Sequence, residues 1–188
     1  ARRGEKPILA GRRAEVIRPM AERHGLEYRV FELDDVRAIA ARLADVDAIA
    51  LAAGPFSATS AKVVEACLVS GTHYTDITGE VDVFEACAAR DAEAKQRGVT
   101  IMPGVGFDVV PTDCVAATLH AALPDATDLV LAFRSLGASS RGTTKTMIEA
   151  LPHGGKVCRD GVLVSVPPAH ETRDIPFRDK TRFAASIP

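Results

Sequence analysis

The feature that most constrains the fold of this chain is an alternation of short apolar runs with stretches of helical periodicity, from Pro7 to about Leu123. Several of the helical stretches end at a glycine, as at Gly25, Gly71 and Gly98, and glycine is common just after a helix. Strands that alternate with helices in this way form βαβ units with right-handed crossovers. The alternation therefore predicts an α/β fold with a parallel sheet.

The same pattern predicts where each element lies. Strands are predicted at residues 7–11, 27–32, 47–53, 73–77 and 100–102. Helices are predicted at residues 13–25, 34–43, 57–70, 82–97 and 113–122. The second helix carries Asp34 and Asp35 in its first turn, where the helix dipole favours acidic side chains. The run DAIALAA at residues 47–53 is apolar nearly throughout, so we expect a parallel strand that is covered on both faces.

The pattern changes after Pro124. The apolar run at residues 128–135 predicts a strand, and a connector rich in glycine and serine separates it from a short predicted helix at residues 144–151. An Asp-Gly pair within residues 156–166 is a β-hairpin signal, whereas no clear periodicity follows Pro167. We therefore expect one domain over residues 1–124 and part of a second, α+β domain over residues 125–188.

Composition narrows the classes of function. Hydrophobic residues make up 47% of the chain and charged residues 26%, which is ordinary for a globular protein and too apolar for a disordered one. The formal net charge is -2 and the sequence pI is near 6.2, so no excess of basic residues points to nucleic acid or to an anionic membrane surface. We expect the partner to be a small-molecule substrate or another subunit.

The sequence also predicts the compartment. Its apolar runs are all shorter than the ~20 residues of a membrane span, and its first residues have no signal-peptide pattern. The cysteines and histidines show no metal-ligand spacing, so we expect no metal site. We expect reduced thiols in a cytoplasmic protein, with Cys114 buried within its predicted helix.

Ligands of open parallel sheets bind at the carboxyl ends of the strands, so the loops after the predicted strands are the candidate site. Arg12 and Arg13 follow the first predicted strand, where a guanidinium can bind the 2′-phosphate of NADP. The alternative is a pair of solvated arginines at a helix start, although the helix dipole disfavours positive charge there. The two arginines favour NADP, with NAD as the alternative cofactor.

The loops after the third and fourth predicted strands have ligand-site features as well. The turn formed by Ala53, Gly54, Pro55 and Phe56 contains small residues that would let a cofactor approach the backbone, and a plain βα loop is the alternative. The string YTDITGE at residues 74–80 concentrates more hydroxyls and carboxylates than a turn needs. Its alternative role is helix N-capping by Thr78 or Asp82.

The longest candidate string is PGVGFDVVPTD at residues 103–113, directly after the fifth predicted strand. Its two glycines match the start of the GxGxxG dinucleotide motif, but Val109 replaces the third glycine, so the motif alone is weak and a tight turn is the alternative. Phe107, Asp108 and Asp113 lie in the same string. This loop is therefore a candidate border of a ligand cleft.

Together these strings resemble the bacterial saccharopine dehydrogenase-like reductases, a family that includes the trans-acting enoyl reductases of lipid synthesis. PILAGRR resembles the second strand of their Rossmann domain, and AAGPF the turn after the fourth. HYTDITGE is similar to their Y-x-D-x-x-G-E segment, and PGVGFDVVPTD to their G-F-D-x-x-P-[ST]-D segment. The matches run from about residue 7 to residue 150.

The resemblance implies an NADP(H)-binding site and assigns residues to it. Arg12 and Arg13 would bind the 2′-phosphate, Ala53, Gly54, Pro55 and Phe56 would line the cofactor, Thr78, Gly79 and Glu80 would lie near the nicotinamide, and Phe107 and Asp108 would border the cleft. In the family, a glycine-rich phosphate loop and a first strand precede this region, and a W-G-D-type segment follows it. We therefore expect a fragment whose first βα unit is missing, inactive on its own and a poor binder of NADP.

The expected reaction is hydride transfer to or from a small C=O, C=N or C=C substrate, with Asp108, Asp113 and Tyr74 as the candidates for handling the proton. Two alternatives stay open. One is a dinucleotide-binding sensor or scaffold without chemistry, and the other is a lyase or transferase of the homospermidine synthase type that recycles its cofactor internally. The resemblance also implies a homodimer formed through the second domain.

Overall fold

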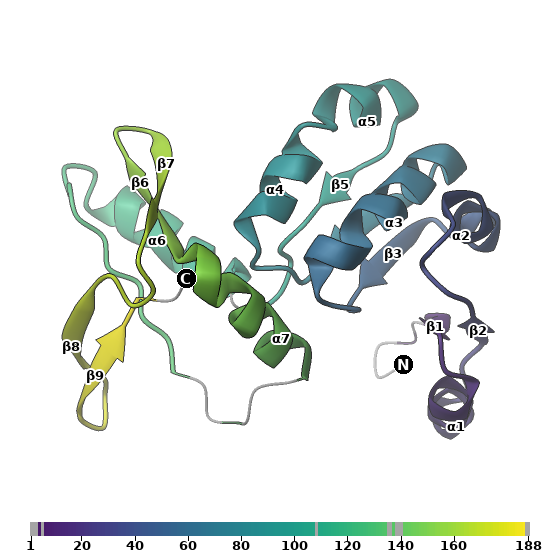
Figure 1. Ribbon diagram of the computed structural model, residues 1–188, viewed down its shortest axis with the longest axis horizontal. Helices are drawn as coiled ribbons and strands as arrows, with labels where there is room; N and C mark the ends of the chain where they lie inside the picture. Colours follow the sequence, from purple (N-terminus) through teal and green to yellow (C-terminus); the bar gives the residue numbers. More distant parts are fainter. Residues whose placement is uncertain (1–3, 5, 108, 135–136, 138–140, 187–188) are drawn as a thin grey trace.

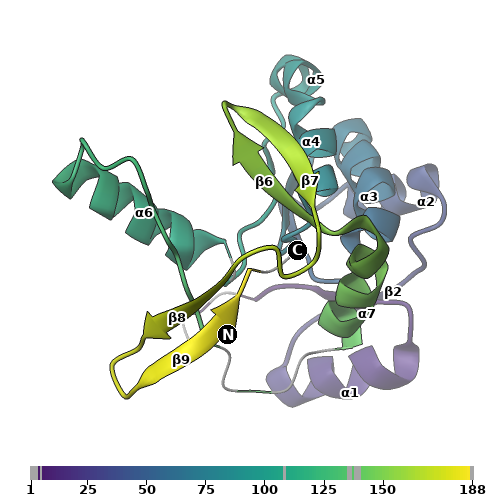
Figure 2. The same ribbon diagram turned by 60° about the vertical axis from the view of Figure 1, so that its left-hand side comes forward.

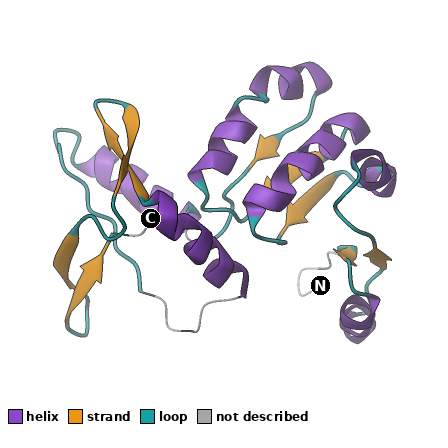
Figure 3. Cartoon of the chain, viewed as in Figure 1, coloured by secondary structure: helices purple, strands orange, loops and turns teal. Residues whose placement is uncertain are grey.

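The computed structural model describes residues 4, 6–107, 109–134, 137 and 141–186 (Figure 1). Helices and parallel strands alternate in the first half of the chain, and antiparallel hairpins appear only in the second half (Figure 3). The predicted α/β class, with parallel βαβ units followed by an α+β part, is therefore confirmed.

The first two strands form a parallel pair. β1 (Leu9–Gly11) and β2 (Tyr28–Val30) are joined by α1 (Ala14–His24). Gly25 ends this helix in the left-handed conformation, with φ 62°, and its amide donates to the carbonyls of the last helical turn. The predicted C-cap glycine is confirmed.

The next three strands form a second parallel sheet in the order β3-β4-β5. Its strands are β3 (Ala48–Leu51), β4 (His73–Asp76) and β5 (Ile101–Met102). Between β3 and β4 runs α3 (Phe56–Ser70), and between β4 and β5 run α4 (Val81–Ala88) and α5 (Asp91–Arg97). The sequence predicted one parallel sheet, whereas in the structure β1 and β3 are not paired and the strands divide between two sheets.

α2 (Val36–Leu43) connects the two sheets and packs against α3. The core lies between these helices and the second sheet, and its most deeply buried large side chains include Ile39, Val63, Leu68 and Tyr74. Asp35 was predicted in the first turn of α2 but is its N-cap, and its carboxylate accepts the Ala38 amide at 2.7 Å. This is the usual role of an aspartate that directly precedes a helix.

Two features of the first half differ from the sequence-based expectations. β3 was expected to be covered on both faces, but Ala48 and Ala50 are exposed and only Leu51 is buried, because the packed helices cover one face of this strand. The helix predicted at residues 82–97 is divided into α4 and α5 at Ala89 and Arg90. Neither glycine nor proline marks this break, so the sequence pattern could not show it.

The second half holds helices and hairpins. Its elements are α6 (Val110–Ala122), α7 (Arg141–Ala150), the short 3-10 helix η1 (Leu151–His153), the hairpin β6 (Gly155–Arg159) and β7 (Val162–Val166), and the hairpin β8 (Thr172–Pro176) and β9 (Thr181–Ala185). Asp160 and Gly161 both have positive φ, as a two-residue hairpin turn requires, so the Asp-Gly prediction is confirmed. The second hairpin lies where the sequence showed no periodicity.

Two expectations for the second half are wrong. A strand was predicted at residues 128–135. Residues 128–134 pair with no other strand of the described chain, and their apolar side chains, such as Leu129 and Val130, are exposed. Cys114 was expected to be buried but is exposed, because no residue of α6 is buried. In Figures 1 and 2, α6 stands away from α3, α4 and α5.

Candidate functional site

The loops that follow β3, β4 and β5 meet at one edge of the second sheet. Because the strands are parallel, their carboxyl ends lie together, and the pairing of Leu51 with Asp76 places the ends of β3 and β4 side by side. We call residues 52–57, 77–80 and 103–107 the carboxyl-edge loops. Hydrogen bonds of two acidic side chains, Asp76 and Glu80, connect these loops to one another.

Asp76, the last residue of β4, is fully buried and is the centre of this network. Its Oδ1 accepts the amides of Thr78 at 3.0 Å and Gly104 at 2.8 Å, and its Oδ2 accepts the Tyr74 hydroxyl at 2.6 Å. Its backbone carbonyl accepts the Val105 amide at 2.8 Å. A buried carboxylate needs such donors, and these donors fix the loop after β5 against the end of β4.

Tyr74, a predicted proton-handling residue, is fully buried and its hydroxyl donates to Asp76. Burial, together with this hydrogen bond, raises the pKa of Tyr74 far above its usual value. The hydroxyl therefore keeps its proton, and in this arrangement the proton is directed to Asp76.

Glu80 connects the loop after β4 to the start of α3. Its Oε1 accepts the Phe56 amide at 2.9 Å and its Oε2 accepts the Ser57 amide at 2.7 Å. α3 has Pro55 at its N-cap and no cap from its own side chains, so Glu80 supplies the acceptors that its first amides need. A carboxylate at this position also interacts favourably with the helix dipole.

Thr78 is fully buried between the two carboxylates. Its amide donates to Asp76, and its hydroxyl accepts the Glu80 amide at 3.0 Å. The alternative interpretation, that Thr78 or Asp82 caps the next helix, is wrong: the N-cap of α4 is Glu80, whose side chain makes no capping hydrogen bond to that helix.

Gly104 needs to be glycine for two reasons. Its φ of 73° lies in the left-handed region, and a Cβ atom there would lie 2.5 Å from the ring of Phe84. The PGVG string is thus held close to Phe84 and fastened to Asp76.

The other predicted cofactor residues lie at the ends of β1 and β3. Arg12 and Arg13 are exposed after β1, at the start of α1, and the Arg13 guanidinium is 4.0 Å from the exposed Glu15 carboxylate. Ala53 and Gly54 are exposed, and a cis peptide bond joins Gly54 to Pro55. Phe56 is buried as part of the core, so its amide rather than its ring faces this edge.

The last predicted residues lie around the start of α6. The side chain of Phe107 is 71% exposed, and its ring makes an edge-to-face contact with Phe133, with 6.5 Å between the centroids. Asp113 is exposed in the first turn of α6. Asp108 lies outside the described residues.

The network thus brings together Tyr74, Thr78, Glu80 and the loop of Ala53 to Phe56. Among the described residues, it does not extend to Arg12, Arg13, Phe107 or Asp113. Sequence reasoning missed Asp76 as a site residue, although its position as the polar last residue of a strand, two residues after Tyr74, was a usable signal. It also missed the role of Gly104.

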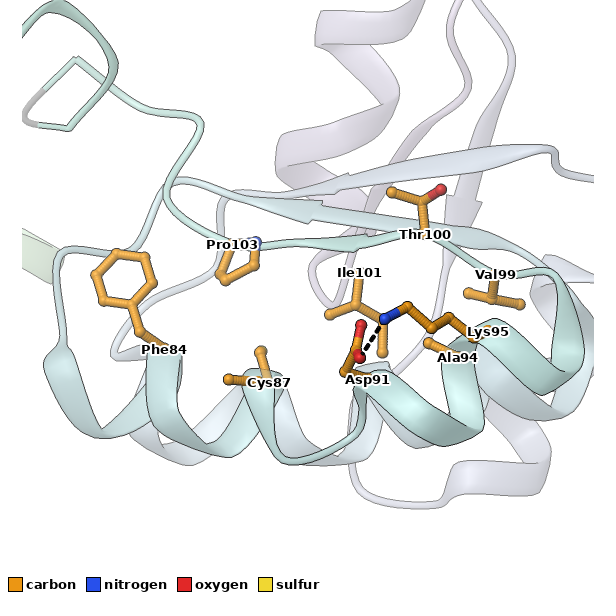
Figure 4. Close-up of a pocket in the computed structure, with 10 residues that line it drawn as sticks. Phe84, Cys87, Asp91, Ala94, Lys95, Val99, Thr100, Ile101 and Pro103 are labelled. Carbon is orange, nitrogen blue, oxygen red and sulfur yellow. Dashed lines mark hydrogen bonds and ion pairs between the residues drawn. The ribbon is translucent and has the colours of Figure 1, made fainter. Parts of the chain in front are cut away.

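A groove of about 420 Å³ lies elsewhere, between α4, α5 and β5 (Figure 4). Its lining is mostly apolar, with Phe84, Cys87 and Ile101 among the side chains, and Lys95 forms an ion pair with Asp91 at 2.6 Å at its border. None of the predicted site residues lines it.

Within the described ranges, no helix has both the length and the apolar character needed to cross a membrane. Among the same residues, no group of three or more His, Cys, Asp or Glu side chains is arranged to hold a metal ion.

No protein-family model matches the chain. It is 34% identical, over 129 aligned residues, to proteins from the H37Rv and CDC 1551 strains of Mycobacterium tuberculosis that are provisionally named trans-acting enoyl reductases. These alignments cover 62% of this chain and 29% of each relative, so the chain spans less than a third of the length of the curated relatives it matches.

A solved structure of apo saccharopine dehydrogenase (L-Glu forming) from Saccharomyces cerevisiae superimposes with a TM-score of 0.53 at 18% identity. The match covers 62% of this chain and 25% of the yeast protein, and at this identity it shows the fold alone. The chain is thus a distant homologue of the trans-acting enoyl reductases over the aligned stretch, and it has the fold seen in saccharopine dehydrogenase.

Proposed function

We propose that this chain belongs to an NADP(H)-dependent reductase that transfers hydride to or from a small C=O, C=N or C=C substrate. The observation that carries the proposal is the set of carboxyl-edge loops, held by Asp76 and Glu80, in a parallel sheet whose sequence is homologous to enoyl reductases. Ligands of parallel α/β sheets bind at this edge. We assign residues 1–124 to the dinucleotide-binding domain and residues 125–188 to the second domain.

The arrangement of the two parallel sheets supports the dinucleotide-binding assignment. Dinucleotide-binding domains have the strand order 3-2-1-4-5-6. The pair β1-β2 and the sheet β3-β4-β5 match the neighbouring strands 2-3 and 4-5-6 of this series, and α2 between the two sheets packs on α3. We propose that a further parallel strand belongs between β1 and β3, and that the loop after it would receive the pyrophosphate at a helix N-terminus.

The cofactor preference is proposed from the end of β1. Arg12 and Arg13 are exposed there, and their guanidinium groups suit a 2′-phosphate. Ala53, Gly54 and Pro55 would border the cofactor on the other side, with Gly79 and Phe107 nearer the substrate. We propose the proton donor among Asp108, Asp113 and Tyr74, of which Tyr74 could act only if its bond to Asp76 opens.

Turnover tests the proposal. NADPH absorbance at 340 nm is followed for the full-length protein with a panel of carbonyl, imine and activated alkene acceptors while products are measured by mass spectrometry. A reductase consumes about one NADPH for each reduced product. Binding of NADPH without product would instead support a sensor or scaffold, and product formed without net NADPH loss would support a lyase or transferase that recycles its cofactor.

A further inference from the structure

We infer that Glu80 and Asp76 are positioning residues that join the carboxyl-edge loops into one rigid unit, so that ligands meet a preformed surface. The inference rests on the proposed function, because it takes this edge as the face that binds cofactor and substrate. It assigns to Glu80 a role different from direct contact with the nicotinamide.

Glu80 fixes the loop after β3. Both of its carboxylate oxygens are used by the Phe56 and Ser57 amides, and Phe56 is anchored in the core on the other side. Two charge-assisted hydrogen bonds to adjacent amides define the direction in which α3 begins. Because Glu80 occupies the positive end of this helix, a cofactor phosphate would have to displace it to bind there, so the phosphates bind elsewhere.

Asp76 fixes the loop after β5. Its Oδ1 is shared by amides from two different loops, those of Thr78 and Gly104, while its backbone carbonyl holds Val105. The carboxylate is fully buried, so loss of any of these donors would leave a buried charge partly unsatisfied. The loop after β5 therefore has little freedom to move away from β4.

Thr78 connects the hydrogen bonds of Asp76 to those of Glu80. It is bonded to Asp76 through its amide and to the Glu80 amide through its hydroxyl, so a path of hydrogen bonds runs from Gly104 to the start of α3. Groups in one hydrogen-bond network have non-additive effects when they are changed. A change at Glu80 is thus expected to reach Gly104 through Thr78 and Asp76.

Amide hydrogen exchange of the chain, followed by NMR, tests this coupling. Glu80→Gln should speed exchange of the Phe56 and Ser57 amides about tenfold, because one strong acceptor is lost, and should also speed the Gly104 amide. Glu80→Ala should speed the exchange of these three amides more strongly than Glu80→Gln does. Glutamine at this position would then preserve part of the slow exchange that glutamate gives. Glu85→Gln is the matched control, since Glu85 is an exposed carboxylate on α4.

Faster exchange confined to Phe56 and Ser57 would overturn the inference, because it would show independent loops. Equal acceleration throughout the core, including α3 as far as Leu68, would also overturn it, because Glu80 would then act through global stability alone.

NADPH affinity of the full-length protein tests the functional consequence. Each of Glu80→Gln and Asp76→Asn should raise the Kd for NADPH about tenfold, and the double variant should raise it little further, as expected for one unit. Additive effects, or unchanged Kd values in folded variants, would contradict the inference. If the unsubstituted protein binds no NADPH, the proposed function fails, while the exchange experiment still decides whether the loops form one unit.

Discussion

Gly104 is the residue at which backbone and packing constraints coincide. Its left-handed φ alone makes alanine unfavourable by about 1–2 kcal/mol, and a Cβ would also collide with Phe84. We predict that Gly104→Ala lowers the free energy of unfolding by about 2–5 kcal/mol, measured by urea denaturation. Gly98→Ala is the matched control, because Gly98 has φ 66° but open space around its Cβ position, so it should lose only about 1–2 kcal/mol. Equal losses for the two variants would show that the contact with Phe84 has no effect.

The cysteines give a second prediction at the scale of residues. Burial raises the pKa of Cys67 to about 12 and that of Cys87 to about 11, whereas Cys114 is exposed. In a Cys158→Ser background at pH 8, an aromatic disulfide reagent should therefore label Cys114 within minutes and the two buried thiols only on unfolding. As pH rises above about 9, the two buried thiols should destabilise the fold, because the unfolded chain loses these protons first. Rapid labelling of all three thiols at pH 8 would contradict this.

At the scale of residues, the sequence showed which segments hold site residues, but it did not show which partners their side chains bond. The hydroxyls and carboxylates of residues 74–80 were recognised as unusually dense, but their partners come from other loops. Glu80 bonds to amides 23 and 24 residues away, and Asp76 to an amide 28 residues away. Such pairings depend on the order of the strands, which local patterns do not contain.

Among the elements, the break between α4 and α5 has a clear anchor. Arg90 at this break bonds to Glu65 of α3 at 2.7 Å and to Glu93 of α5 at 2.6 Å. We predict that Arg90→Ala lowers the thermal midpoint more than Lys95→Ala, the control that removes an exposed pair with Asp91. Differential scanning calorimetry of the two variants would make the comparison. Equal thermal midpoints would show that the bonds of Arg90 to Glu65 and Glu93 stabilise the fold no more than an exposed ion pair does.

The same contact has a pH dependence. The bond from Arg90 holds the pKa of Glu93 below its ordinary value of 4.5. A carboxyl group with a lowered pKa contributes stability above its ordinary pKa and loses it as the pH falls through the lowered value. The difference in thermal midpoint between the unsubstituted chain and Arg90→Ala should therefore be complete at pH 6 and shrink below about pH 4.

Elements with strong local signals were predicted well. The strands and helices from β1 to β5, with their C-cap glycines, and the Asp-Gly hairpin all lie close to the predicted positions. Two predictions were wrong, the strand at residues 128–135 and the continuous helix at residues 82–97. Each of these structures depends on contact with another element. A strand needs a neighbour to bond, and the helix break depends on a contact with α3.

For the whole molecule, the division of the parallel strands into two sheets is the feature that only the structure could show. The sequence predicted parallel βαβ units, and both sheets have them, but the separation of β1 and β2 from the other described parallel strands is a property of the complete arrangement. The homology and the carboxyl-edge loops are the observations from which we propose a dinucleotide-binding domain.

Cofactor selectivity is the most direct test of that account. NADPH and NADH are titrated into the full-length protein and binding is followed by nicotinamide fluorescence, with Arg23→Ala as an exposed-arginine control on α1. We predict that NADPH binds at least about tenfold more tightly than NADH, and that the Arg12→Ala, Arg13→Ala double variant loses this difference without changing the affinity for NADH. Absence of saturable binding of either cofactor, or an NADPH preference that survives the double variant, would contradict the account.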